Sequence, residues 1–443
     1  MNATGILFSL VCLGALLPLP ALAAADNAAP EEGDIISRTD NKPAPPPGGK
    51  ITQDNYVMVI LKRGATEIKI PSSVVKEVLY GDRDVSYDEA VKKRDDSRFT
   101  TAALNFDKAR ENLAATKWAA EYCNYGIGDA LYQSGNLTGY KGKSGKEYSP
   151  ASVYFKKALE ANPKSRFMPD IVVKLPVCLA EEGKLDEADA ARIDAEDRIK
   201  KYRDETIKVG DGYGEIADRA SAQLAIADAR IAERKAAKGK GNLNEVLDKW
   251  QSARSKCLRF NELLAETIEG VLRTQIAKKD YTGAQGEAQS IVDKYNKESD
   301  PKLLSQLPGA YTALGKANLG QATEYDAKGQ KLQANNSYAE ARWDFLNVVA
   351  QYFDNDDDVA SAHYFAGICY EKLKNLEPDA HDRAVREWKL VVSHFPKSVF
   401  KEKAEKELTD AGVTLDAPSK TDAPKPDPKA SSKTPAKTSA PQK

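Results

Sequence analysis

A pattern of four side chains occurs twice in this chain with identical spacing. A small residue is followed by an aromatic four positions later, a small or aliphatic residue three after that, and a proline five further on. The two full copies are Ala151, Phe155, Ala158 and Pro163, and Ala384, Trp388, Val391 and Pro396. Offsets of four and three place side chains on one helical face, and the proline lies where a helix must end. The pattern therefore predicts repeated helices with one closely packed face.

The residues around both copies resemble the tetratricopeptide repeat (TPR), a pair of helices of which the second carries this pattern. The first-helix positions of the repeat are matched by Gly128, Leu131 and Gly135 in one copy and by Gly367 and Tyr370 in the other. The tripeptides 163–165 and 396–398 are both Pro-Lys-Ser, which ends one helix and offers a serine cap to the next. The resemblance implies stacked helix pairs, because one pair cannot bury both of its faces.

Weaker copies fill the interval between the two full copies. Tyr281 with Ala284, and Tyr338 with Phe345, fit the turn and second helix of two further pairs. Residues 202–272 have a helical pattern but do not align to the motif. Either longer helices or a divergent helix pair interrupt the repeats there. We expect a mainly α fold, a TPR-like helical-hairpin solenoid over residues 85–411, preceded by a small N-terminal β unit.

The small β unit is expected at residues 51–84. Residues 56–62 are rich in β-formers, and Arg63-Gly64 is a plausible turn. Ile68 and Ile70 alternate with charged residues, which is the two-residue period of a half-buried strand. Residues 74–80 are a candidate third strand. Three short strands bury little surface alone, so we expect this unit to pack on the first helices.

The two ends of the chain differ from its middle. Residues 6–17 form an apolar run that is too short to span a bilayer, and Ala21-Leu22-Ala23 offers a small-x-small cleavage site. We expect a cleaved signal peptide at 1–25, with an uncleaved anchor as the alternative, and a Pro-rich linker at 26–50. Residues 412–443 form a Lys/Pro/Ala-rich tail that cannot bury enough surface to fold and is expected to be disordered. The tail is expected to be a passive tether. The alternative is that it contacts peptidoglycan or another anionic envelope polymer.

The charge balance and the missing motifs exclude several classes of function. Lys plus Arg number 65 and Asp plus Glu 66, so nothing favours nucleic acid as a partner. No phosphate-binding loop, nucleophile elbow or zinc-protease motif is present. His363, His381 and His394 lack the spacing of helical metal ligands. We therefore expect no enzyme activity, no cofactor and no metal. The cysteines 123, 178, 257 and 369 lie in helical patterns, where buried free thiols are favoured over disulfides.

The TPR resemblance also implies a binding surface, because partners of the family lie against first-helix residues. The matching positions, which form the predicted groove, are Tyr87, Arg94, Tyr122, Tyr125, Asp129, Tyr132, Tyr364 and Glu371. Tyrosine provides a large contact area at a small entropic cost. The alternative is that these rings pack between helices as core or seal the β unit.

The export signal and the repeats together resemble exported envelope TPR proteins. That group includes the coordinator of the Tol-Pal division system and the repeat lipoprotein of the outer-membrane assembly machine. The resemblance implies a non-enzymatic scaffold for protein or peptide partners in the bacterial envelope, periplasmic or secreted, with outer-membrane association as a further option. A self-assembling surface component, or an enzyme or metal module in the divergent middle, are the alternatives.

Overall fold

The chain folds into two compact units, which are described separately. The computed structural model describes residues 33–40, 42–45, 48–142, 145–210, 212–297, 307–352 and 356–413. Unit 1 comprises residues 1–184 and 193–218, and unit 2 comprises residues 185–192 and 219–443. The predicted signal peptide, and the predicted tail from residue 414 onward, lie outside the described residues.

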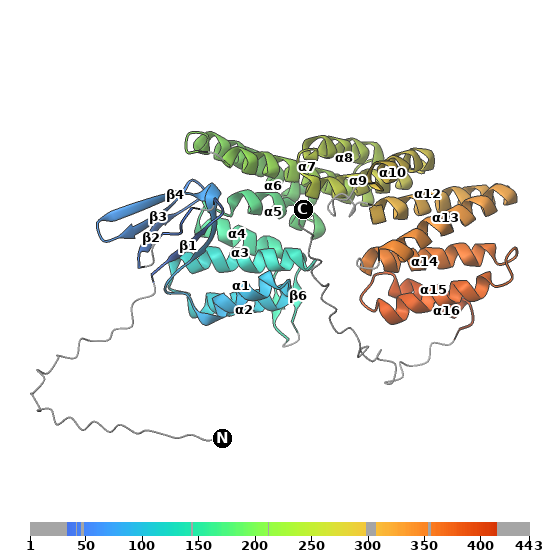
Figure 1. The fold of residues 1–443 in the computed structure, drawn as a ribbon, viewed down its shortest axis with the longest axis horizontal. Coiled ribbons are helices and arrows are strands. Elements are labelled where there is room, and N and C mark those ends of the chain that lie inside the picture. The colour runs from blue at the N-terminus through green and yellow to red at the C-terminus, as the bar shows by residue number, and fades with distance from the viewer. Residues whose placement is uncertain are drawn as a thin grey trace, which may run out of the picture. The chain divides into compact units, whose positions relative to one another are not determined.

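The N-terminal part of unit 1 is a β unit of short antiparallel strands (Figure 1). Its elements are β1 (Ile35–Arg38), β2 (Lys50–Asp54), β3 (Met58–Arg63), β4 (Thr66–Pro71), the short 3₁₀ helix Ser72–Val74, and β5 (Val75–Leu79). Strands β2, β3 and β4 form a meander, and β1 pairs with β5. Val59 and Leu61 of β3 are buried on one side, and Val59 lies opposite Ile70. The three predicted strands are confirmed, and Gly64 occupies the predicted turn with φ of 60°.

Strand β1 lies inside residues 26–50, the segment predicted to be a linker, so that prediction is wrong for this stretch. Ile36 of β1 is buried and lies opposite Val78 of β5. A four-residue strand whose partner is distant in sequence has almost no local signal, and the surrounding prolines concealed it. The β unit therefore begins earlier than residue 51.

Hydrogen bonds and ring contacts hold the β unit against the helices of unit 1, as expected. Tyr80, at the end of β5, stacks on Trp118 with ring centroids 4.5 Å apart. The backbone N–H of Tyr56 donates to the carbonyl of Lys164 at 2.9 Å, and its hydroxyl donates to Glu205 at 2.7 Å. These contacts bury one side of a sheet that is too small to be stable alone.

The helices of unit 1 follow the β unit and pack consecutively (Figure 1). They are α1 (Val85–Asp95), α2 (Phe99–Asn112), α3 (Lys117–Gln133), α4 (Ala151–Ala161) and α5 (Met168–Glu181). A small hairpin of β6 (Tyr140–Lys141) and β7 (Glu147–Tyr148) lies in the insertion between α3 and α4. Helix α3 contacts α5 as well as α4, so first helices of successive pairs are neighbours.

Two long helices explain why the middle of the chain does not align to the motif. They are α6 (Leu185–Thr206) and α7 (Tyr213–Ala237), and both are divided between the units. With 22 and 25 residues, they are the longest helices among the described residues. The longer-helix alternative is therefore confirmed for residues 202–206 and 213–237.

Unit 2 continues the consecutive packing of helix pairs. Its remaining helices are α8 (Leu243–Cys257), α9 (Asn261–Ala277), α10 (Tyr281–Tyr295), α12 (Leu307–Ala327), α13 (Lys331–Gln351), α14 (Asp356–Leu373), α15 (Ala380–His394) and α16 (Lys401–Asp410). Helix α12 contacts α9 and α14 in addition to its chain neighbours α10 and α13. The first helices α9, α12 and α14 therefore form one layer of stacked pairs.

Glycines on one helix of a pair face aromatic rings on the other. A Cβ atom at Gly128 of α3 would lie 2.9 Å from the ring of Phe155 of α4. A Cβ at Gly367 of α14 would lie 2.4 Å from Nε1 of Trp388 of α15. These are the glycine and aromatic positions of both full motif copies, so the pattern records a close approach of two backbones. The predicted fold class, mainly α and TPR-like with a small N-terminal β unit, is confirmed.

The repeated Pro-Lys-Ser tripeptide makes the same hydrogen bond in both places. Ser165 Oγ accepts from the backbone N–H of Phe167 at 3.0 Å, just before α5. Ser398 Oγ accepts from the backbone N–H of Phe400 at 3.2 Å, just before α16. Each serine thus satisfies a donor near the start of the next helix.

Buried apolar side chains, including the four predicted thiols, fill the helix interfaces. Cys123, Cys178, Cys257 and Cys369 are free and buried, as predicted. Burial raises the pKa of Cys123 and of Cys257 to about 12, so these thiols stay protonated and inert.

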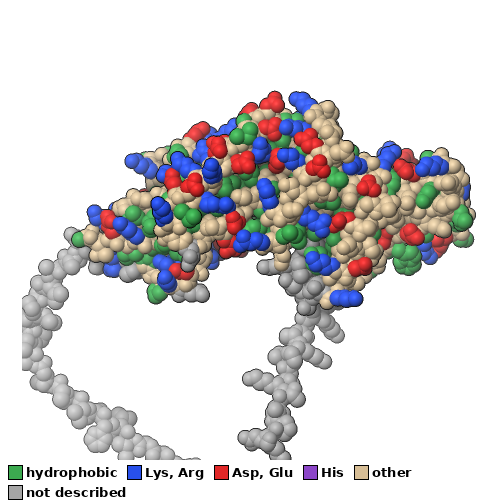
Figure 2. Space-filling model, turned by 90° about the horizontal axis from the view of Figure 1, so that it is seen from above, with side chains coloured by type: hydrophobic (Ala, Val, Ile, Leu, Met, Phe, Trp, Pro, Cys, Tyr) green, Lys and Arg blue, Asp and Glu red, His purple; other side chains and the backbone are tan. Residues whose placement is uncertain are grey.

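The surface carries both signs of charge. On the face shown in Figure 2, Lys and Arg side chains are interspersed with Asp and Glu. This mixing agrees with the balanced composition of the chain. Within the described residues, no helix combines the length and apolar character that a bilayer span requires.

Candidate functional site

Three of the predicted groove residues lie together on α3 and face α5. The hydroxyl of Tyr125 donates to Asp170 at 3.0 Å. The ammonium of Lys174 lies 2.7 Å from Asp129, 2.6 Å from Asp170 and 5.4 Å from the ring centroid of Tyr132. We call Tyr125, Asp129, Tyr132, Asp170 and Lys174 the α3–α5 face.

The charged groups of the α3–α5 face hold one another in place. Burial opposes the charge of Lys174, but the charges of Asp170 and Asp129 keep the pKa of the lysine above its ordinary value. Burial and the charge of Asp170 raise the pKa of Tyr125, so its hydroxyl stays a donor. The ring of Phe167 stacks on Tyr125 with centroids 4.0 Å apart. The face therefore presents ordered phenol groups beside fixed charges.

Two other predicted groove residues are buried, as Asp129 of the α3–α5 face also is. Tyr87 is 6% exposed and packs edge-on against Phe106 and Trp118. Tyr122 is 3% exposed, and its hydroxyl donates to Asp54 of the β unit. Both positions fit the alternative in which these rings form core and seal the β unit.

The remaining predicted residues are Arg94 of unit 1, whose charge opposes the rise in the pKa of Tyr125, and Tyr364 and Glu371 of unit 2. Arg94 of α1 is 3.8 Å from Glu77 of β5. In unit 2, the hydroxyl of Tyr364 donates to Glu407 at 3.4 Å, and Glu371 contacts His381 at 2.7 Å. A role of the eight residues in partner binding stays a prediction.

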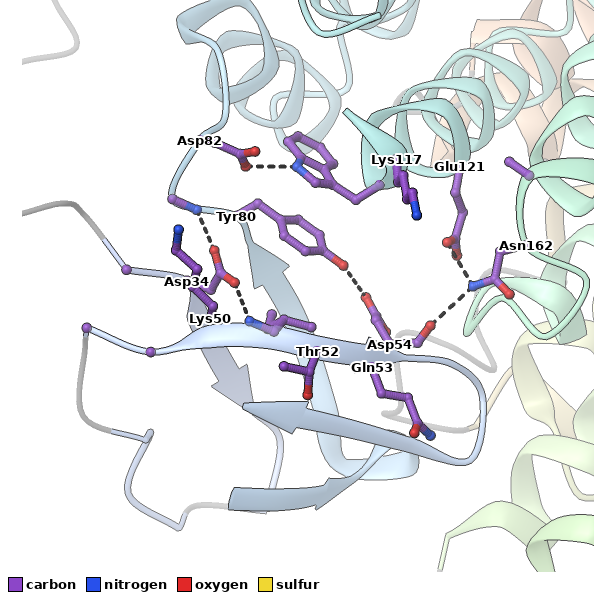
Figure 3. Close-up of a pocket in the computed structure, with 17 residues that line it drawn as sticks. Asp34, Lys50, Thr52, Gln53, Asp54, Tyr80, Asp82, Lys117, Glu121 and Asn162 are labelled. Atoms are coloured by element: carbon purple, nitrogen blue, oxygen red, sulfur yellow. Dashed lines mark hydrogen bonds between the residues drawn. The ribbon is translucent and has the colours of Figure 1, made fainter. Parts of the chain in front are cut away.

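A cavity of about 700 Å³ lies between the β unit and the start of α3 (Figure 3). We call it the β–α3 cavity. Its carboxyl groups are those of Asp34, Asp54, Asp82 and Glu121, and its lysines are Lys50 and Lys117. Trp118 and Tyr80 also line it. Concave sites of this size bury small ligands or single side chains.

The two carboxylate oxygens of Asp54 have different surroundings. One oxygen, Oδ2, accepts hydrogen bonds from Tyr122 and, at 3.0 Å, from Tyr80. The other oxygen, Oδ1, is buried without a hydrogen-bond donor and lies 4.0 Å from Nε of Arg166. A buried carboxylate oxygen without a donor costs free energy, and the charge of Arg166 offsets part of that cost.

Glu121 is buried beside Asp54 and carries a perturbed carboxyl group. Ser165 Oγ donates to it at 2.5 Å and Asn162 Nδ2 at 2.9 Å. Burial raises the pKa of Glu121 to about 7; these hydrogen bonds oppose the rise, and the charge of Asp54 adds to it. The group therefore changes charge near neutral pH.

Asp34 joins two ends of the β unit at the mouth of the cavity. Its carboxylate accepts from the backbone N–H of Ile51 at 2.5 Å and of Gly81 at 2.7 Å (Figure 3). Asp82, which follows Gly81, accepts from the indole N–H of Trp118 at 2.9 Å and fixes the ring. The walls of the cavity are thus set by side chains that have few alternative positions.

Sequence reasoning missed every residue of the cavity. Asp34 lay in the predicted linker, and Asp54 and Trp118 belong to no motif. Glu121 occupies an ordinary helical position, and its burial depends on the β unit packing above it. Within the described ranges, His, Cys, Asp and Glu side chains form no group of three that could hold a metal ion.

Comparison with known proteins adds little to this picture. No protein-family model and no curated protein matches the chain. Among solved structures, the chain is similar to the crystal structure of the P58(IPK) TPR domain at 13% sequence identity. The match covers 74% of this chain and 96% of that one, with a TM-score of 0.18, which is too low to carry an argument. The stacked helix pairs and their glycine–aromatic contacts define the chain as a TPR-like helical-repeat protein.

Proposed function

We propose that the chain is a non-enzymatic scaffold that binds a protein partner on the α3–α5 face in the bacterial cell envelope. The observation that supports this most is the arrangement of Tyr125 and Tyr132 beside Lys174. Tyrosines that are already ordered lose little entropy on binding, and they are frequent at interaction surfaces. Lys174 and its two carboxylates bind one another and hold the two tyrosines in position.

A protein segment suits this face better than a small molecule. None of its five residues lines the β–α3 cavity, so a ligand there would lie along the surfaces of α3 and α5. First-helix faces of stacked pairs offer a continuous strip for an extended or helical segment.

The capture of partners from an envelope fraction tests the proposal. Full-length protein should retain a specific partner, and Tyr132→Ala or Lys174→Ala should reduce its recovery about tenfold, the loss that one interface anchor typically causes. Trp343→Ala and Lys331→Ala are matched controls, because these side chains are 63% and 73% exposed in unit 2. Equal recovery by all four variants would contradict a role for the α3–α5 face.

Envelope localisation is part of the same proposal. It is supported by the apolar run at residues 6–17, the cleavage site at 21–23 and the resemblance to exported TPR proteins such as the Tol-Pal coordinator. The lysines of residues 414–443 would contact peptidoglycan or another anionic polymer. Mass spectrometry of protein from a periplasmic fraction should find a mature chain that begins near Ala24. A chain that keeps Met1 in the cytoplasmic fraction would contradict export.

A further inference from the structure

We infer that the β–α3 cavity binds a primary alkylammonium group, with Asp54 and Glu121 next to the charge and Trp118 and Tyr80 beside the carbon chain. The group could belong to a lysine side chain of a protein segment or to a free diamine. This inference does not depend on the α3–α5 face, whose residues lie outside the cavity.

The first argument is a shortage of positive charge around the buried carboxyl groups. Asp54 and Glu121 are both buried, and Arg166 is the buried cation next to them. Arg166 does not line the cavity; its guanidinium lies 4.8 Å from the ring centroid of Phe167. The cavity is lined by four carboxyl groups and by two lysines, Lys50 and Lys117, so carboxyl groups are in excess, and a cationic ligand can balance them.

The second argument is the unfilled acceptor on Asp54. The side chain of Asp54 is 6% exposed, and Oδ1 has no hydrogen-bond donor. Its other oxygen is taken by two tyrosine hydroxyls. An ammonium group has three donors and no acceptor, which suits a cavity lined by carboxyl groups.

The third argument is the aromatic wall. Trp118 and Tyr80 stack on each other with an angle of 6° between their planes, and both line the cavity. Aromatic faces attract ammonium groups and pack against the methylene chain that carries them. An anionic ligand would instead meet Asp54 and Glu121 at close range.

Lys117 lies at the rim of the cavity, and its removal should affect cationic and anionic ligands in opposite directions. Its side chain is exposed, and it lines the cavity near Glu121. A fixed positive charge at the rim repels a cationic ligand. Replacing Lys117 with Met should therefore strengthen the binding of an ammonium ligand, while an anionic ligand would bind more weakly.

The charge of Glu121 makes the binding depend on pH. The neighbouring ionisable groups are Asp54 of β2, Tyr80 after β5, Lys117 and Tyr122 of α3, and Arg166 before α5. The other charged groups that line the cavity are Asp34, Lys50 and Asp82. Burial raises the pKa of both tyrosines. Burial lowers the pKa of Arg166, but the charges around it raise that pKa by more. A ligand ammonium competes with the proton of Glu121. Affinity should rise about tenfold from pH 6 to pH 8, because the ionised fraction rises from about a tenth to about nine-tenths.

Isothermal titration calorimetry of the full chain tests the inference. The probes are 1,5-diaminopentane and Nα-acetyl-lysine N-methylamide, and the uncharged control is Nα-acetyl-norleucine N-methylamide. The amines should bind, with the rise in affinity between pH 6 and pH 8. E121Q should abolish that rise, D54N should weaken binding at least tenfold, and K117M should strengthen it. Glu89→Gln, an exposed carboxylate on α1, is the matched control and should bind as the original chain does.

The outcomes separate the two sources and can overturn the inference. Binding of the lysine amide points to a protein segment as the source, and binding of the diamine alone points to a free amine. Circular dichroism of D54N shows whether the fold persists, and the K117M and pH results stand without that variant. No binding of either amine, equal binding of the norleucine control, or weaker binding by K117M would overturn the inference.

Discussion

At the scale of single residues, glycine sets how closely two consecutive helices approach. A Cβ atom at Gly270 of α9 would lie 2.2 Å from the indole of Trp250 of α8, and one at Gly315 of α12 would lie 2.6 Å from Phe345 of α13. These rings are fully buried and cannot retreat into solvent. A methyl group at either glycine must therefore displace packed core.

Gly270→Ala is expected to destabilise the protein by about 1–3 kcal/mol, the usual cost of overpacking a closed interface. Gly286→Ala is the matched control, because Gly286 lies in α10 with no atom within 4 Å of its missing Cβ. That change should stabilise the helix by up to about 1 kcal/mol. Thermal melting followed by far-ultraviolet circular dichroism measures both, and equal shifts for the two variants would contradict the packing.

Glu121 makes the stability of unit 1 depend on pH. Burial raises its pKa from the ordinary 4.5 to about 7, so the folded chain keeps a proton that the unfolded chain releases. This contribution to stability is complete below about pH 4.5 and is lost as the pH rises through 7. Glu121→Gln should therefore gain stability relative to the original chain between about pH 5 and pH 8, by the order of 2–3 kcal/mol.

The melting temperatures of Glu121→Gln and of the original chain at pH 5 and at pH 8 measure this difference. Glu67→Gln is the control, because Glu67 is exposed on β4. The account fails for Glu121 if both variants show the same pH dependence.

At the scale of elements, Asp34 fastens the β unit. It joins the start of β1 to the N–H of Ile51 in β2 and to that of Gly81 after β5. Without it, two backbone donors lose their partner at the junction of the two small sheets. Strands this short depend on such links, because they bury little surface by themselves.

Asp34→Ala should loosen β1, β2 and β5 by about 1–3 kcal/mol, the cost of leaving hydrogen-bonding groups unpaired. Hydrogen exchange read by mass spectrometry should show faster exchange in residues 35–38 and 50–54. Peptides from α12 and α13 in unit 2 should keep their rates and serve as the internal control. Unchanged exchange in the β unit would show that Asp34 does not fasten it.

The sequence predicted the elements that carry a local pattern. The second helices α4 and α15 and the strands β3 and β4 follow from periodicity, because their buried faces repeat every few residues. Strand β1 was missed because its partner β5 is distant. The pair of Trp250 and Gly270 was missed because the aromatic precedes the glycine, the reverse of the motif order. The cavity was missed because Asp54 and Glu121 become neighbours only when the β unit packs on α3.

At the scale of the whole molecule, one mode of packing builds both units. Consecutive helices pair, and first helices of successive pairs touch, in unit 1 at α3 and α5 and in unit 2 at α9, α12 and α14. Unit 1 adds the β unit, and with it the β–α3 cavity. The α3–α5 face and the cavity are therefore separate features of unit 1, which different variants can test.

Site-specific photocrosslinking tests the central claim most directly, that the α3–α5 face binds a protein partner. p-Benzoylphenylalanine is placed at Tyr132, and at Trp343 as the control, because Trp343 is an exposed aromatic on the second helix α13. After irradiation in an envelope fraction, position 132 should give a discrete crosslinked product and position 343 none. The absence of a product at 132, or identical products at both positions, would contradict the account.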